Sequence, residues 1–185
     1  NPEYDLWYKM LNCGFHLPAS TGSDWFVCSN NRVYACTGTD FSYDTWLAAL
    51  KKGQTFITNG PALLLSVDGY GPGAFLPCTS KRALEVKAEW RSFHPIEVVE
   101  IVRDGFVIAR KEFATGSREG SFVQTVLPET DGWIAARCSG NARDSFDQAI
   151  FAHTSPVYVQ TGALSPAREE AARFFLDAIR GSVDW

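Results

Sequence analysis

The sequence predicts an α+β fold: a short segment of helices and strands, an antiparallel β-sandwich and a closing helix. Two observations lead to this prediction. Helical periodicity is confined to the first 62 residues and to the C-terminal end. Between these parts, short apolar runs alternate with turn residues about every ten positions, a spacing typical of β-sandwiches. We therefore divide the chain into residues 1–62, 63–160 and 161–185.

The N-terminal segment is predicted to contain two helices. Residues 3–12 have apolar side chains at i,i+4 spacing, and Gly14 suits the left-handed residue that follows a helix. The second helix begins after Ser42, whose hydroxyl can cap it, and ends at Gly53. Its acidic residue lies at the start and its two lysines at the end, where the helix dipole favours them.

Short strands are predicted at residues 32–36 and 55–58, and a turn at 59–61 ends the second. A segment of about 60 residues is scarcely large enough to form an independent α/β domain with a core of its own. It therefore docks on the sandwich, continues a barrel or sheet that lies outside the chain, or pairs with another chain. We expect it to expose apolar side chains, and hence to self-associate or to pair with a separate N-terminal piece. These side chains are Leu6, Leu11 and Trp46.

The middle of the chain reads as six to eight short antiparallel strands, which favours an immunoglobulin-like sandwich. Strict alternation over residues 83–90 puts four apolar side chains on one face. Asp104-Gly105 lies between two apolar runs and is the strongest hairpin signal in the chain. His94 and Pro95 are assigned to a loop, and Pro156 interrupts the last strand. The remaining strands are predicted at residues 98–103, 106–110, 121–127, 133–138 and 148–160.

The C-terminal segment predicts one amphipathic helix. Ser165 can cap it and Pro166 fits its first position. An apolar stripe runs along it and is expected to dock on the rest of the fold. The stripe consists of Ala171, Phe174, Phe175, Ala178 and Ile179.

Composition excludes several classes of function. A net charge of −4 and a pI near 5.4 argue against nucleic-acid binding, which needs a clustered basic face. No apolar run approaches the ~20 residues of a membrane span. The five cysteines include no CxxC pair, so we expect free thiols or at most one disulfide, and the compartment stays open. Because the chain begins at Asn1 instead of a methionine and its first thirteen residues read as the middle of something longer, we expect a processed, excised or truncated chain.

Three residues are candidates for a site. Asp24 follows Gly22-Ser23 in a loop, where a carboxylate can bind a metal ion or form an Asx-turn. His16 could face a substrate near Asp24, or form a Cys–His–Asp set with Cys13, although a structural role for both neighbours is the simpler interpretation. Asn59 could point toward the rim of a site or simply form the turn at 59–61. His153 is interpreted as an exposed or interdomain polar residue.

Four segments carry a resemblance to a known family. In chain order they are NCGFHLPASTGSD, NRVYAC, FSYDTWLAALKKGQTFITNGP and FAHTSPVYV. Together they resemble the C-terminal half of the carbaryl-hydrolase-type (CehA/McbA family), PHP-like metal-dependent hydrolases, over about residues 5–180. The resemblance implies a distorted β/α barrel with two or three divalent metals, followed by a β-sandwich. It also implies hydrolysis of esters, carbamates or phosphoesters by metal-activated water.

By this resemblance, residues 1–62 are the last piece of the barrel and Asp24 is a metal ligand. The metals would be of the Zn or Mn class. The family's other ligands have no counterpart here, since the three histidines include no His-x-His pair. We therefore expect the chain alone to be inactive and to bind no metal stably, with the ester or phosphoester substrate bound through the missing barrel half. The alternative is a non-catalytic β-sandwich module that binds a protein or a saccharide.

Overall fold

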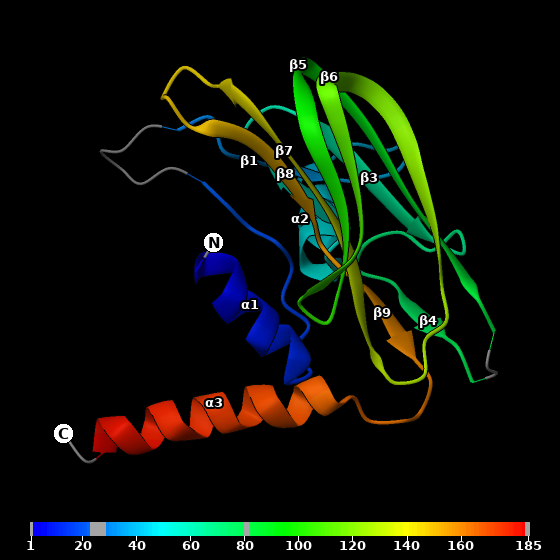
Figure 1. Ribbon diagram of the computed structural model, residues 1–185, viewed down its shortest axis with the longest axis vertical. Coiled ribbons are helices and arrows are strands. Elements are labelled where there is room, and N and C mark those ends of the chain that lie inside the picture. Colours follow the sequence, from blue (N-terminus) through cyan, green and yellow to red (C-terminus); the bar gives the residue numbers. More distant parts are fainter. Residues whose placement is uncertain (1, 23–28, 80–81, 184–185) are drawn as a thin grey trace.

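The computed structural model describes residues 2–22, 29–79 and 82–183 (Figure 1). This part of the chain is mixed α and β, as predicted, with three helices and one nine-stranded sheet. The helices are α1 (Pro2–Asn12), α2 (Tyr43–Lys52) and α3 (Pro166–Val183). The strands are β1 (Arg32–Ala35), β2 (Thr55–Thr58), β3 (Ala62–Val67), β4 (Phe75–Pro77), β5 (Leu84–Arg103), β6 (Phe106–Val126), β7 (Gly132–Arg143), β8 (Ala149–Thr154) and β9 (Val157–Gln160).

The sheet joins the N-terminal segment to the β-rich segment. Its main order is β1-β2-β8-β7-β5-β3, with β6 beside β5 and β9 between β7 and β4. All pairs are antiparallel except β4 with β9. The link is the pairing of β2 with β8, in which Ile57 lies opposite His153. Of the three arrangements expected for the first 62 residues, the described part of the chain therefore shows docking on the β-segment.

The longest feature of the sheet is the β5–β6 hairpin. Its turn is at Asp104 and Gly105, whose φ angles of 52° and 94° are those of the two-residue turn predicted there. The strands predicted at 83–90 and 98–103 are parts of one strand, so the loop predicted at His94-Pro95 is wrong. Register shifts between Arg91 and Ile96 bend β5 there without ending it.

The bend in β5 creates the main core. The first half of β5 pairs with β3 and the second half with β7, so side chains from both regions meet in one buried cluster. The apolar face predicted for residues 83–90 is buried, as expected. Burying one such side chain contributes roughly 1.5–3 kcal/mol. Large members of the cluster are Leu63, Leu84, Val86, Trp90, Ile101, Ile134 and Ile150.

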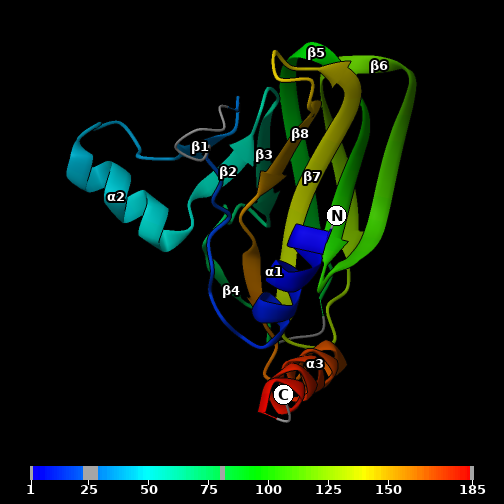
Figure 2. The ribbon, with the colours of Figure 1, turned by 90° about the vertical axis from the view of Figure 1, so that its left-hand side faces the viewer.

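Helix α1 lies across β7 and forms a second, smaller core (Figure 2). Tyr8 and Leu11 of the helix pack on Trp133 of β7, which is 2% exposed. The expectation that Leu11 is exposed is therefore wrong, because its side chain faces the sheet. Leu6 is exposed as expected, and Trp46 of α2 is half-buried.

Helix α2 has the ends that the sequence predicts. Ser42 Oγ accepts a hydrogen bond from the Thr45 N–H, and Thr45 Oγ1 accepts one from the Ser42 N–H, which completes a capping box. Gly53 has the left-handed conformation, with φ of 72°.

The C-terminal end of α2 touches the turn before β4 at Gly73. This glycine has φ of 80°, and a Cβ placed on it would lie 1.9 Å from the carbonyl oxygen of Lys52. We expect Gly73→Ala to lower the free energy of unfolding by about 2 kcal/mol or more, through backbone strain and displacement of α2. Gly71→Ala is the matched control, since nothing lies within 4 Å of its Cβ position. Equal urea midpoints for the two variants would contradict the prediction.

Helix α3 docks less fully than its apolar stripe predicts. Ser165 Oγ accepts from the Ala167 N–H, as expected for a cap, and Ala171 is buried. Farther along, Phe174 is 45% and Ile179 is 60% exposed, although Lys9 of α1 lies over the Phe174 ring. The expected docking is therefore limited to the start of the helix. None of the described helices is both long and apolar enough to cross a membrane.

Candidate functional site

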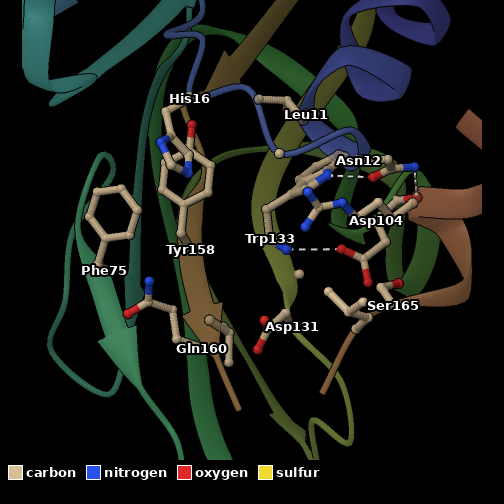
Figure 3. Close-up of a pocket in the computed structure, with 15 residues that line it drawn as sticks. Leu11, Asn12, His16, Phe75, Asp104, Asp131, Trp133, Tyr158, Gln160 and Ser165 are labelled. Carbon is tan, nitrogen blue, oxygen red and sulfur yellow. Dashed lines mark hydrogen bonds between the residues drawn. The ribbon is translucent and has the colours of Figure 1, made fainter. Parts of the chain in front are cut away.

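A cavity of about 280 Å³ lies where the end of α1, the start of α3 and the lower ends of three strands meet (Figure 3). The strands are β4, β7 and β9, and the turn between β5 and β6 closes one side. One wall is aromatic and the other is polar. The residues that define the cavity are Asn12, His16, Phe75, Asp104, Asp131, Trp133, Tyr158, Gln160, Ser165 and Arg168.

The aromatic wall comes from the parallel pair β4 and β9. Phe75 and Tyr158 lie opposite each other in that pairing, and their rings stack with centroids 5.1 Å apart. His16 meets both rings edge-on, at centroid distances of 4.8 Å and 4.6 Å. Phe75 is 43% exposed, because β4 is short and little covers it. Burial raises the pKa of Tyr158 to about 12, so its phenol stays protonated near neutral pH.

Two aspartates form the polar wall. Asp104 Oδ1 accepts the Trp133 N–H at 2.9 Å, and Asp104 Oδ2 lies 3.4 Å from Arg103 Nε. Burial raises the pKa of Asp104, while these two partners oppose the rise. Asp131 Oδ1 accepts the N–H groups of Thr161 and Gly162 at 2.6 Å and 2.8 Å. Asp131 thereby holds the loop between β9 and α3 in place, and its second oxygen has no partner among the described residues.

Two further polar side chains reach the cavity without a partner. The Arg168 guanidinium lies beside Gly14, 3.9 Å from the position a Cβ would take there. The Gln160 backbone oxygen accepts from Cys78 N–H at 2.7 Å, while its side-chain amide is exposed. Within the described part of the chain, neither the Arg168 guanidinium nor the Gln160 amide has a hydrogen bond or ion pair. The cavity therefore offers a ligand the N–H donors of the Arg168 guanidinium and both the donor and the acceptor of the Gln160 amide.

Of the predicted site residues, the two that the structure describes, His16 and Asn59, lie at different places. His16 lies at the rim of this cavity. Asn59 lies elsewhere: its amide donates to Asp144 Oδ2 and to the Ala149 carbonyl oxygen, and its oxygen accepts the Phe151 N–H. Asn59 therefore ties the β2–β3 turn to the β7–β8 hairpin, the turn-forming alternative. Asp24 lies outside the described residues.

The proposed pairing of Cys13 with His16 has no structural counterpart. The Cys13 N–H donates to the Lys9 carbonyl oxygen and ends α1. The His16 ring contacts Phe75 and Tyr158. Both residues are described, and no contact between the Cys13 thiol and His16 is present.

Sequence reasoning missed a buried histidine network between α1 and the sheet. His153 is fully buried, so the exposed alternative is wrong, whereas its contact with Tyr8 of the N-terminal segment agrees with the interdomain alternative. Its Nδ1 lies 2.7 Å from the Thr154 carbonyl oxygen and must donate to it. Nε2 therefore accepts the Tyr8 hydroxyl, 2.5 Å away. Burial, with a smaller contribution from the nearby Arg137, lowers the pKa of His153 to about 4, although the hydrogen bond to Thr154 opposes the shift. The aromatic cluster in α1 was the only signal for this network.

A buried carboxylate lies next to this network. Glu100 Oε2 accepts from Arg137 Nε at 2.5 Å, and Glu100 Oε1 pairs with Arg110 at 2.6 Å. The Glu100 side chain is only 8% exposed, so its charge depends on the two arginines. Burial raises the pKa of Tyr8 to about 12 and keeps this hydroxyl a donor to His153.

A third buried polar contact fixes the loop that leads toward Asp24. The Ala19 N–H donates to Ser155 Oγ at 2.8 Å, and Ser155 Oγ lies 2.7 Å from Thr55 Oγ1. The Ser155 N–H donates to the Thr55 carbonyl oxygen at 2.9 Å. All three residues are buried. Three segments distant in the sequence, one of them the start of β2, are thereby joined at one point.

Comparison with models of protein families, with curated proteins and with solved structures found no match. Among the residues that the structure describes, no group of three or more His, Cys, Asp or Glu side chains is placed to hold a metal ion.

Proposed function

We propose that this chain is the C-terminal part of a PHP-like metal-dependent hydrolase of the carbaryl-hydrolase type. In this proposal residues 1–62 are the last units of a β/α barrel, residues 63–160 are an immunoglobulin-like sandwich, and residues 161–185 close the fold. The intact protein would hydrolyse an ester, a carbamate or a phosphoester.

One observation carries the proposal beyond the sequence resemblance. Ala19, Thr55 and Ser155 come from three different segments that resemble the family, and their hydrogen bonds meet at one buried point. Tyr8 and His153 likewise join α1 to the FAHTSPVYV segment. Segments that carry the resemblance therefore contact one another in the fold, which supports reading them as parts of one architecture. The support concerns the arrangement of these segments, and the chemistry is inferred from the resemblance.

In the proposal, Asp24 is one ligand of a divalent metal of the Zn or Mn class. Asp24 follows Ala19, whose N–H donates to Ser155 Oγ, by five positions. Such a metal lowers the pKa of bound water and stabilises negative charge in the transition state. Each ion needs several ligands, and the described residues do not supply them. The other ligands are assigned to the barrel half that precedes this chain.

The first test uses the chain alone. We expect the 185-residue chain to show no esterase or phosphodiesterase turnover with added zinc or manganese, because one carboxylate cannot bind the ions. Chromogenic esters and bis-aryl phosphates are suitable substrates. Robust turnover that Asp24→Ala abolishes would show that this chain holds a complete site and would contradict the proposal.

The second test uses the protein encoded by the complete reading frame. Asp24→Ala is expected to reduce kcat/KM at least about 100-fold, the order seen when a partner of a metal site is lost, and to lower the bound metal measured by mass spectrometry. Asp44→Ala is the matched control, because Asp44 is an exposed carboxylate at the start of α2. Unchanged metal content and turnover in Asp24→Ala would refute the role of Asp24.

A second candidate function is a binding module, and the cavity in Figure 3 favours it. An aromatic wall facing unpartnered polar groups is the usual composition of a small-molecule site. The two functions are compatible, since a hydrolase can carry a ligand-binding accessory domain.

A further inference from the structure

We infer that the cavity between Phe75–Tyr158 and Asp131–Arg168 binds a single pyranose ring of a neutral saccharide. This inference deepens the binding-module candidate and does not depend on the hydrolase proposal. It rests on the composition of the two walls, on their charge balance, and on the size and rigidity of the cavity.

The aromatic wall suits the apolar face of a sugar ring. A pyranose presents C–H groups on one face and hydroxyls around its edge, so it needs an aromatic surface on one side only. Phe75 and Tyr158 provide that surface, and Phe75 is 43% exposed beside the cavity. His16 lies edge-on to both rings and adds its ring nitrogens at the rim of the cavity. A fully apolar ligand would leave the opposite wall unpaired.

The polar wall suits hydroxyl groups. A hydroxyl both donates and accepts, so it can pair with the Arg168 guanidinium, with the Gln160 amide and with the second oxygen of Asp131. These three groups lie on the cavity and have no other partner among the described side chains. Figure 3 shows Gln160 next to Phe75 and Tyr158 and Asp131 toward Trp133, so polar groups are not confined to one side of the cavity. A ligand limited to donors or to acceptors would satisfy only part of this set.

The charges disfavour an ionic ligand. Asp104 is paired with Arg103, which leaves the Asp131 carboxylate and the Arg168 guanidinium on the cavity. Their charges oppose each other, so neither an anion nor a cation gains a net attraction. Neutral polyols avoid this conflict because they pair with both groups.

The cavity is small and already formed. Its volume of about 280 Å³ is at the lower end of the ~300–1,000 Å³ typical of ligand sites, which favours one ring over an oligosaccharide. The polar wall is held by hydrogen bonds that the Trp133 N–H donates to Asp104 and the Thr161 N–H donates to Asp131. Because these groups are fixed before binding, little ordering is required of the protein.

The test is binding of neutral methyl pyranosides to the purified chain. Saturation-transfer NMR with methyl glycosides of glucose, galactose, mannose and N-acetylglucosamine is expected to show saturable binding of at least one of them. An acyclic hexitol is the matched ligand control, because it has the hydroxyls without the rigid ring, and it should bind at least about tenfold more weakly. Acetate and sulfate test for an anion site.

Substitutions in the cavity test whether the saccharide binds there. We expect each substitution to raise the Kd about tenfold. Phe75→Ala loses the contact with the sugar ring, and Gln160→Ala loses the hydrogen bonds of the amide. Phe93→Ala is the matched control, because Phe93 is 82% exposed and lies outside the cavity. Both test residues are exposed, so the variants are expected to fold, which circular dichroism verifies.

Three outcomes would overturn the inference. They are no saturable binding by any of the pyranosides, binding unchanged in both Phe75→Ala and Gln160→Ala, and binding of acetate or sulfate that no pyranoside shares. The last outcome would leave a ligand-binding cavity of different specificity, so the binding-module candidate would survive it. None of them bears on the hydrolase proposal, which the Asp24 variants test separately.

Discussion

Trp133→Ala is expected to lower the free energy of unfolding by about 3–5 kcal/mol, the range for removing a buried tryptophan. Trp133 is 2% exposed, packs against Tyr8 with the ring centroids 4.9 Å apart, and donates its indole N–H to Asn12 Oδ1 at 2.7 Å. These contacts join α1 to β7. A helix of 11 residues is only marginally stable in water, so α1 depends on this contact to stay folded.

Chemical unfolding and amide exchange of α1 measure this effect. Trp133→Phe keeps much of the packing and loses the bond to Asn12, so we expect it to cost about 1–2 kcal/mol. Phe93→Ala changes an aromatic residue that is 82% exposed and serves as the control. If Trp133→Ala unfolds at the same denaturant concentration as Phe93→Ala, Trp133 does not join the helix to the sheet.

Acid is expected to destabilise the chain through His153. The folded state lowers the pKa of this imidazole to about 4, whereas an unfolded histidine titrates near 6.5. The unfolded chain therefore binds a proton more readily, and stability falls as the pH falls from about 6.5 through 4. From this group alone we expect a loss of about 2.5 kcal/mol between about pH 7.5 and 4.5. The physical cause is that protonated His153 would be a buried cation close to Arg137.

Urea unfolding of the wild type and of His153→Gln across this pH range isolates the effect. The variant is less stable near neutral pH, because it loses the Tyr8 hydrogen bond, but it lacks the titrating imidazole. The difference in stability between the two proteins should shrink as the pH falls. The low pKa values of Asp68 and Asp144 affect both proteins equally and cancel. A difference that is constant with pH would refute the prediction.

Elements specified by near neighbours could be predicted from the sequence. The capping box at Ser42 and the left-handed Gly53 depend on residues a few positions apart, and both are present. The Asp104-Gly105 turn requires positive φ at both positions, which this pair tolerates well. The alternation over residues 83–90 identified the buried face, because each strand has one side toward the core.

The length of β5 could not be predicted. Pro95 marked a break in the pattern, and a loop was the simplest interpretation of it. The sheet instead absorbs the irregularity as a shift of register between Arg91 and Ile96, because strands on both sides continue the pairing. Similarly, the stripe on α3 predicts a helix but not how much of it finds a partner, since Ile179 is 60% exposed.

The candidate site could be predicted from the sequence even less well than the fold. Of the three predicted residues, His16 lines the cavity, Asn59 forms a turn, and Asp24 lies outside the described residues. The aromatic wall exists because β4 and β9 pair in parallel, which places Phe75 beside Tyr158. No local pattern predicts a contact between residues so distant in the chain.

The sequence by itself determined the α+β class, the caps of α2, the hairpin turn and the buried face of β5, since these depend on short-range periodicity and on the conformations that single residues permit. Only the tertiary structure decided which residues form the cavity and which polar groups are buried. His153 illustrates the reason: its burial depends on α1 folding back over β7 and β8, a contact across 145 positions. Such contacts depend on strand register and on the bend in β5, and many sequence patterns are compatible with more than one arrangement.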